Sequence, residues 1–261
     1  MRWDWYQATV NAHHEQVIGD LMVAAGPEVN GRDCKPIAPY KVGLELERDG
    51  EHVAKIYWGG HNPLPHVRAS GKAAQHVADW LRALPYDHRP SRVDACVDYQ
   101  GPEAWERLKD IWEDTADNHN LKLTAHGDFY REQEGRSLYL GSRKSVVYAR
   151  CYEKGKQTGG DPDWVRAEVE CKPKTHARER VARMSPEEVW GLSRWGIHLL
   201  RSLEGVEVPR VQAGTLYQPS EVERMRAWML RQYGPALEQW AQEVGGWSHL
   251  GEVLGERITG Q

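Results

Sequence analysis

Alternating and helical patterns of hydrophobic residues divide the chain into a β-rich first part and a helical end. Short runs of alternating or β-branched residues predict strands, and apolar positions spaced by three and four residues predict helices between them. The predicted strands are 5–10, 41–47, 52–58, 66–70, 92–99, 121–125, 137–140, 146–153 and 164–172. The predicted helices between them are 13–25, 71–84 and 102–119. This order predicts an α+β fold built on a mainly antiparallel sheet.

From about residue 175 the pattern becomes helical. Helices are predicted over 186–203, 220–233, 235–244 and 248–257, with Ser220 as a candidate N-cap. The Pro-containing stretch 209–219 predicts a linker. We therefore expect a β-rich domain over 1–207 and a C-terminal helical region over 218–261. The sequence shows no internal repeat at a solenoid period.

Composition narrows the class of protein. A net charge of -4 is unlike that of a non-specific DNA-binding protein, which is usually basic. Between Arg131 and Lys156, however, seven basic residues stand against three acidic ones. That excess suits phosphate contacts, with a solvated mixed-charge surface as the alternative. The four cysteines form no C-x-x-C pair, and we find no signal peptide or membrane-length apolar run. We therefore expect a cytoplasmic protein with free thiols and no membrane partner.

Two predicted strands each place carboxylates on a single face, because side chains alternate along a strand. The polar face of 92–99 carries Arg92, Asp94, Cys96 and Asp98. The polar face of 164–172 carries Arg166, Glu168 and Glu170. Four crowded carboxylates repel one another unless a cation joins them, and their oxygens suit hard ions. The pattern favours a site for Mg²⁺ or Mn²⁺, with a solvated sheet face as the alternative.

A third strand places a tyrosine among cations. Tyr148, Arg150, Tyr152 and Lys154 are expected to share a face. A tyrosine hydroxyl, whose ordinary pKa is about 10, is a weak nucleophile at neutral pH unless neighbouring cations or a metal lower that value. Arg150 and Lys154 are placed to do so. The alternative is an ordinary strand tyrosine.

A short turn lies between two of these strands. Ser142, Arg143 and Lys144 follow Gly141 there and offer backbone N–H groups and two cations to a phosphate. A plain hairpin turn has the same composition. The sequence has no His-hydrophobic-His triple, H-E-x-x-H, G-x-S-x-G or P-loop, which argues against zincin, α/β-hydrolase and ATPase chemistry.

The order and spacing of these motifs resemble the replication initiation factor family of rolling-circle plasmids and filamentous phages. The motifs are Arg92-Val-Asp-x-x-x-Asp98, Tyr139-Leu-Gly-Ser-Arg-x-Ser145, Arg150-x-Tyr-Glu-Lys154 and Trp164-Val-Arg-x-Glu-x-Glu-x-Lys172. Upstream, Tyr57-Trp-Gly-Gly60 and His66-Val-Arg-Ala-Ser-Gly71 also look like phage members, so the resemblance covers roughly residues 1–205. Relaxases of some integrative conjugative elements are related to this family.

The resemblance implies a fold related to the HUH endonucleases, with a central antiparallel sheet and helices on one face. It implies that residues 1–207 nick and rejoin single-stranded or cruciform origin DNA through a 5′-phosphotyrosine at Tyr152, assisted by Arg150 and Lys154. The implied ligands of Mg²⁺ or Mn²⁺ are Asp94 or Asp98 and Glu168 or Glu170. The implied DNA contacts are Ser142, Arg143, Lys144, Arg166 and Lys172.

Three alternatives stay open at the level of the sequence. A conjugative relaxase would use the same chemistry, a non-catalytic origin or operator-binding protein would keep the fold, and a phosphoesterase would use water in place of the tyrosine. The expected partner is origin DNA in a bacterial host cell, together with a host helicase or polymerase. The sequence leaves open the origin, the metal, the oligomeric state and the role of the C-terminal helices.

Overall fold

The computed structural model describes residues 1–131, 134–211 and 221–260, and the chain divides into a first unit, Met1–Thr215, and a second, Leu216–Gln261. The described part of the first unit contains a ten-stranded, entirely antiparallel sheet. The strand order is β2-β3-β4-β5-β1-β6-β10-β9-β8-β7. The strands are β1 (Arg2–Val10), β2 (Val29–Asp33), β3 (Tyr40–Arg48), β4 (Glu51–Gly60), β5 (His66–Ser70), β6 (His88–Tyr99), β7 (Leu123–His126), β8 (Ser137–Leu140), β9 (Val147–Glu153) and β10 (Val165–Cys171).

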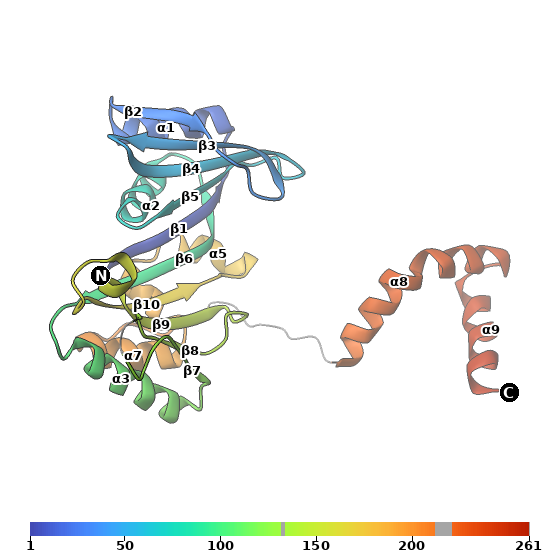
Figure 1. Ribbon diagram of the computed structural model, residues 1–261. Helices are drawn as coiled ribbons and strands as arrows, with labels where there is room; N and C mark the ends of the chain where they lie inside the picture. The colour runs from blue at the N-terminus through green and yellow to red at the C-terminus, as the bar shows by residue number, and fades with distance from the viewer. Residues whose placement is uncertain (132–133, 212–220, 261) are drawn as a thin grey trace. The chain divides into compact units, whose positions relative to one another are not determined.

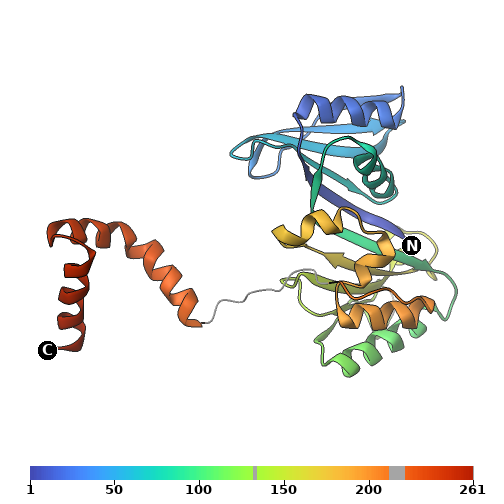
Figure 2. The same ribbon diagram turned by 180° about the vertical axis from the view of Figure 1, so that it is seen from behind.

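Helices cover one face of this sheet, as Figure 2 shows from behind, and the long helices leave the other face open in Figure 1. The helices of the first unit are α1 (His14–Ala25), α2 (Ala73–Ala83), α3 (Ala104–His119), α4 (Lys154–Thr158), η1 (Thr175–Ala177), α5 (Arg178–Val181), α6 (Pro186–Trp190) and α7 (Arg194–Glu204). The predicted α+β fold with an antiparallel sheet and helices on one face is confirmed.

The hydrophobic core lies between the sheet and the helices. Alternate residues of the central strands, such as Ala95, Ala167 and Ala149, are fully buried there. Helix α3 presents Leu108 and Trp112 to the same core, because positions four apart lie on one helix face. The other half of each strand's residues therefore points to what we call the open face, the sheet surface that carries Asp94, Glu168, Arg150 and Tyr152.

The sheet consists of two halves with the same element order. Strand β1 is followed by α1, β2, β3, β4, β5 and α2, and β6 is followed by α3, β7, β8, β9, β10 and α5, with the short α4 inserted. Outward from the central pair β1–β6, the strands run 1-5-4-3-2 on one side and 6-10-9-8-7 on the other. The sequence pattern did not predict this repeat of elements.

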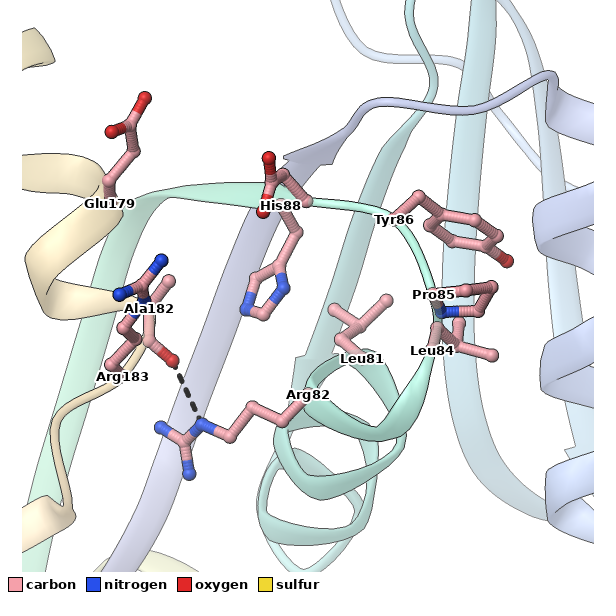
Figure 3. Close-up of a pocket in the computed structure, with 10 residues that line it drawn as sticks. Leu81, Arg82, Leu84, Pro85, Tyr86, His88, Glu179, Ala182 and Arg183 are labelled. Carbon is pink, nitrogen blue, oxygen red and sulfur yellow. Dashed lines mark hydrogen bonds between the residues drawn. The ribbon is translucent and has the colours of Figure 1, made fainter.

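The two halves are joined on the helical side by an arginine of α2. The Arg82 side chain donates a hydrogen bond to the carbonyl oxygen of Ala182 at 2.9 Å (Figure 3) and another to that of Met184 at 2.6 Å, both in the second half. A cavity of about 430 Å³ lies beside it and is also lined by His88 and Arg183. Because the guanidinium supplies a charged donor to both carbonyls, it links elements that are a hundred residues apart in the sequence.

The structure corrects several predicted boundaries. Strand β2 and helix α4 were not predicted, and β6 begins at His88, four residues before the predicted start at Arg92. The helix expected over 186–203 is two helices, because Ser185 forms a capping box that starts α6 and Ser193 caps α7 by accepting from the Gly196 N–H. The predicted linker falls largely on residues 212–220, outside the described part of the chain, as does Ser220.

The described residues of the second unit form α8 (Glu221–Glu243) and α9 (Trp247–Thr259). The two helices expected over 220–233 and 235–244 are one, since α8 continues through Pro235. Met225, Trp228 and Tyr233 of α8 are about half exposed. In the described ranges of the whole chain, no helix is long and apolar enough to span a membrane.

Candidate functional site

Strands β6, β10 and β9 are neighbours, and their register brings the predicted site residues together on the open face. Glu170 pairs with Asp94 of β6 and with Tyr148 of β9. Glu168 pairs with Arg150 of β9, and its other neighbour, Cys96, belongs to the polar face predicted for β6. The face assignments made from alternation along β6, β9 and β10 therefore agree with the observed pairing.

Tyr152 lies against Glu168 at the centre of this face. Its hydroxyl donates a hydrogen bond to Glu168 Oε2 (3.1 Å), and Arg150 donates to Glu168 Oε1 (2.5 Å). Burial raises the pKa of Tyr152 above its ordinary value, the charge of Glu168 raises it further, and Arg166 and Arg150 only partly oppose this. The cations therefore do not bring this pKa below its ordinary value in the resting site, contrary to the expectation from the sequence.

Asp94 is the most enclosed of the β6 carboxylates. It is 1% exposed and accepts two hydrogen bonds from Arg92, at 2.9 and 2.5 Å. Burial raises the pKa of Asp94 well above its usual range, and the nearby Glu168 adds to the effect against the attraction of Arg92. Two buried acids side by side favour a state in which one of them holds a proton.

Asp98 belongs to a separate group of charges. It accepts hydrogen bonds from Arg166 (2.6 and 3.0 Å) and from the Trp164 indole (2.9 Å). Arg166 also donates to Asp4 of β1 (2.6 Å). Burial tends to raise the pKa of Asp98, but the hydrogen bonds from Arg166 and Trp164 hold it below its usual value. Sequence reasoning missed Asp4, because the first predicted strand began one residue after it.

The residues predicted to bind metal do not form a complete metal site. Asp94 and Glu168 lie near each other, but Asp98 pairs with Arg166, and Glu170 forms ion pairs with Lys172 and with Arg92. Within the described ranges, no group of three or more His, Cys, Asp or Glu side chains is placed to hold an ion. Dependence on Mg²⁺ or Mn²⁺ therefore stays a prediction.

A pocket of about 380 Å³ opens beside Tyr152. Its lining includes Arg150 and Tyr152 of β9, Lys154 at the start of α4, and Ser137 and Tyr139 of β8. The Lys154 ammonium lies 5.7 Å from the centre of the Tyr152 ring. Asp4, Glu134 and Glu153 also line the pocket, so its charge is mixed. Arg150 and Lys154 are the cations next to the tyrosine that suit a phosphate group.

The turn between β8 and β9 lies at one end of the site strands. Ser142, Arg143 and Lys144 are exposed there, and the Arg143 guanidinium lies over the ring of Tyr139 at 5.8 Å. The Ser142 hydroxyl accepts from the Lys144 N–H, and Lys172 donates to the Arg143 carbonyl. The two cations are thus exposed, while the serine hydroxyl takes part in the turn itself.

The chain is similar to known proteins in two comparisons, one with a family model and one with a solved structure. Residues 92–187 match the family model described as replication initiation factor. In fold, the chain is similar to the rolling circle replication initiator protein from Geobacillus stearothermophilus, with a TM-score of 0.52 and 19% identity, covering 80% of this chain and 97% of that chain. The chain resembles the replication initiation factor family. No curated protein matches it.

The residues that match the replication initiation factor model coincide with the second half of the sheet. The match starts at Arg92 in β6 and ends at the second residue of α6, so it includes most of β6 and the whole of β7, β8, β9 and β10. All of the predicted catalytic, metal and DNA-contact residues lie within it. The Tyr57 and His66 motifs of the first half lie outside it, whereas the structural match covers 80% of the chain.

Proposed function

We propose that this chain is a rolling-circle replication initiator that nicks and rejoins single-stranded or cruciform origin DNA, with Tyr152 as nucleophile. One observation carries the proposal: the Tyr152 hydroxyl donates to a fully buried carboxylate, Glu168, beside a pocket with cations, inside the segment that matches the family model. A tyrosine whose proton already points at a carboxylate has its proton acceptor in place for nucleophilic attack.

The proposed step is a transesterification at a DNA phosphate. The Tyr152 oxygen attacks phosphorus, its proton passes to a Glu168 oxygen, and the bond from phosphorus to the 3′-oxygen breaks. The leaving 3′-oxygen takes a proton from water and becomes a 3′-OH, Glu168 returns its proton to water, and the 5′-phosphate stays on Tyr152. Reversal of the same step by a 3′-OH rejoins the strand, because one phosphodiester is exchanged for another ester of similar energy.

Arg150 has two possible partners in this scheme. In the resting site its guanidinium neutralises Glu168. A phosphate in the pocket competes for the same guanidinium, since arginine binds phosphate and carboxylate through the same pair of donors. When Arg150 turns to the phosphate, Glu168 loses its counter-charge and becomes a stronger proton acceptor. Substrate binding would thereby activate Tyr152, whose pKa is raised in the resting site.

Mg²⁺ or Mn²⁺ remains part of the proposal as a requirement to be tested. Asp94 and Glu168 are the two carboxyl groups nearest to forming a site, but no third ligand joins them in the described residues. No step above passes through a metal. The origin, as DNA, is the proposed partner, and recruitment of a host helicase or polymerase is a further expectation.

The test is formation of a covalent protein–DNA adduct. Purified full-length protein is incubated with labelled single-stranded oligonucleotides that tile its own replicon, with Mn²⁺, with Mg²⁺ or with a chelator. The products are separated on a denaturing protein gel. We expect an adduct that Tyr152→Phe abolishes and that the chelator removes. Tyr148→Phe is the matched control, because Tyr148 lies on the same face of β9 without a hydrogen bond to Glu168.

Each other outcome redirects the proposal. Cleaved DNA without an adduct would indicate a nuclease that uses water. An adduct that persists in Tyr152→Phe and is lost in Tyr148→Phe would move the nucleophile. Tight binding of a verified origin without cleavage would favour the binding-only protein. A nick restricted to a transfer origin would favour a relaxase. An adduct formed equally well with chelator would refute the metal requirement alone.

A further inference from the structure

The repeated element order allows strand positions of the catalytic half to be matched with positions in the first half. In the second half, Arg166 of β10 pairs with Tyr152 of β9. In the first half, His66 of β5 pairs with Tyr57 of β4. Both pairings lie level with the next-to-last residue of the central strand, so Tyr57 occupies the position that Tyr152 has in the other half.

The neighbouring positions differ in charge between the halves. Glu168 lies two residues after Arg166, and Arg68 lies two residues after His66. Glu168 pairs with Arg150, and Arg68 pairs with Lys55. The position that is an anion in the catalytic half is therefore a cation in the first half.

Tyr57, the counterpart of Tyr152 in the first half, is shielded from solvent. Tyr57 is only 1% exposed, and the sheet position next to it is Gly43. A side chain at Gly43 would meet the Cys34 carbonyl at 2.8 Å, so the segment after β2 lies tightly over this part of the face. Burial raises the pKa of Tyr57 as well. The first half thus has no accessible counterpart of the nucleophile and can contribute only binding.

Arg68 differs from the other arginines at the centre of the open face. Arg92, Arg150 and Arg166 each form ion pairs with carboxylates. Arg68 has no ion pair with any described residue and instead lies over two aromatic rings, Trp5 at 5.3 Å and Tyr57 at 5.5 Å. Such contacts hold a guanidinium in place while leaving its N–H donors free for an anion.

Side-chain contacts connect Arg68 with the catalytic site across the sheet. Arg68 and Arg92 both lie over Trp5, and Arg92 binds Asp94. Asp94 in turn lies 3.8 Å from Arg150, which holds Glu168 against Tyr152. Four strand spacings across the sheet and about six residues along it separate Arg68 from Tyr152, roughly 25–30 Å. One strand of DNA on the open face would follow this line.

We propose that Arg68, held on Trp5, is a phosphate-binding subsite for the DNA strand that enters or leaves the Tyr152 site. The first half of the sheet is then a non-catalytic copy that binds the same strand the second half cuts. This inference rests on the proposed function, because it takes the scissile phosphate to lie at Tyr152. A phosphate is the chemical match, since a fixed, unpaired guanidinium on a sheet face favours a strand with regularly spaced negative charges.

The test is the dependence of DNA binding on oligonucleotide length and salt. Fluorescence anisotropy is measured in the Tyr152→Phe background, so that cleavage does not enter, with oligonucleotides shortened one nucleotide at a time from each end. Arg68→Gln, which keeps part of the side-chain stem, should weaken binding of long oligonucleotides about 5- to 10-fold at low salt. It should also reduce the slope of log affinity against log salt by about 0.7. Below a certain length the variant and its parent should bind alike.

Two further variants make the result decisive. Arg68→Lys keeps the charge and should preserve the salt slope. Arg201→Ala removes the same charge from α7 in the helical layer, where Arg201 pairs with Glu207, and should change neither affinity nor slope beyond a small amount. Equal binding by Arg68→Gln and its parent at every length would overturn the subsite. So would an equal loss at every length, because it would show a general charge effect. Failure of the wild type to form any adduct would count against Tyr152 chemistry and leave these binding results standing.

Discussion

A buried histidine in the seam between the two halves predicts how stability depends on pH. His88 at the start of β6 is 7% exposed and lies 2.8 Å from the Tyr6 hydroxyl, beside the cavity that Arg82 also lines (Figure 3). Burial, assisted by the charge of Arg82, lowers the pKa of His88 from 6.5 to about 4. The folded protein therefore holds this imidazole neutral at a pH where an unfolded chain would protonate it.

The sign and size of the effect follow from linkage. Between pH 6.5 and about 4 the unfolded chain binds more protons at this site than the folded chain, so the free energy of unfolding falls as the pH falls. The stabilisation is present above pH 6.5 and lost on acidification through that window. A pKa lowered from 6.5 to about 4 corresponds to about 3 kcal/mol. His66 has a pKa lowered in the same way, to about 4, and adds a comparable loss.

The assay is urea unfolding of the full chain, followed by tryptophan fluorescence, at pH values from 7 to 4.5. We expect His88→Gln to lower the free energy of unfolding at pH 7. We also expect it to remove most of the roughly 3 kcal/mol by which His88 makes that free energy fall between pH 6.5 and about 4. His176→Gln removes an exposed imidazole and should give a profile parallel to that of the wild type. Parallel profiles for the wild type and His88→Gln would refute the argument, because they would show that His88 takes up no proton on unfolding in this window.

Three further substitutions test the site and its support. Glu168→Gln should slow nicking by about 10²- to 10⁴-fold in a timed adduct assay, because it removes the proton acceptor, and an unchanged rate would contradict that role. Gly155→Ala should destabilise the protein by about 3 kcal/mol or more in thermal unfolding, since a Cβ there would lie 1.4 Å from the Asp161 carbonyl; wild-type stability would contradict the observed approach. Glu153→Gln should cost about 3 kcal/mol in urea unfolding, because it breaks the buried ion pair with Arg136, and no loss would indicate that the pair is not desolvated.

Local patterns in the sequence predicted most strands and the long helices of the first unit, and local context explains the errors. Four of the five residues of β2 are exposed, so Val29–Asp33 shows no alternation that would predict a strand. The strand forms because it pairs with the edge of β3. Helix α8 passes through Pro235, although proline usually ends a helix. The break between α6 and α7 was predictable, because Ser185 and Ser193 are both good N-caps.

The sequence predicted which residues of the candidate site face the same side of each strand, but it did not predict how they contact one another across strands. Alternation along single strands placed Asp94, Glu168 and Tyr152 on polar faces, and this needs only the period of a strand. Which carboxylate meets which arginine depends on the register between strands whose paired residues lie up to 78 positions apart in the sequence. That register assigns Asp98 to Arg166 and separates it from Asp94. The same limitation hid the repeat, because the halves share an element order without an evident sequence repeat.

The charge arrangement of the open face suggests an order of events for DNA binding. Each carboxylate predicted to bind metal has an arginine within 2.9 Å, so a phosphate at the catalytic half must compete with Asp94, Glu168 or their neighbours for its cation. Arg68 in the first half has no such competitor among the described residues. If both proposals hold, a strand gains its first contact at Arg68 without displacing an ion pair. It then exchanges carboxylate for phosphate at Arg150, which frees Glu168 to accept the Tyr152 proton. The acidic overall charge is therefore compatible with DNA binding, because the acids at this site hold the arginines in position until a phosphate replaces them.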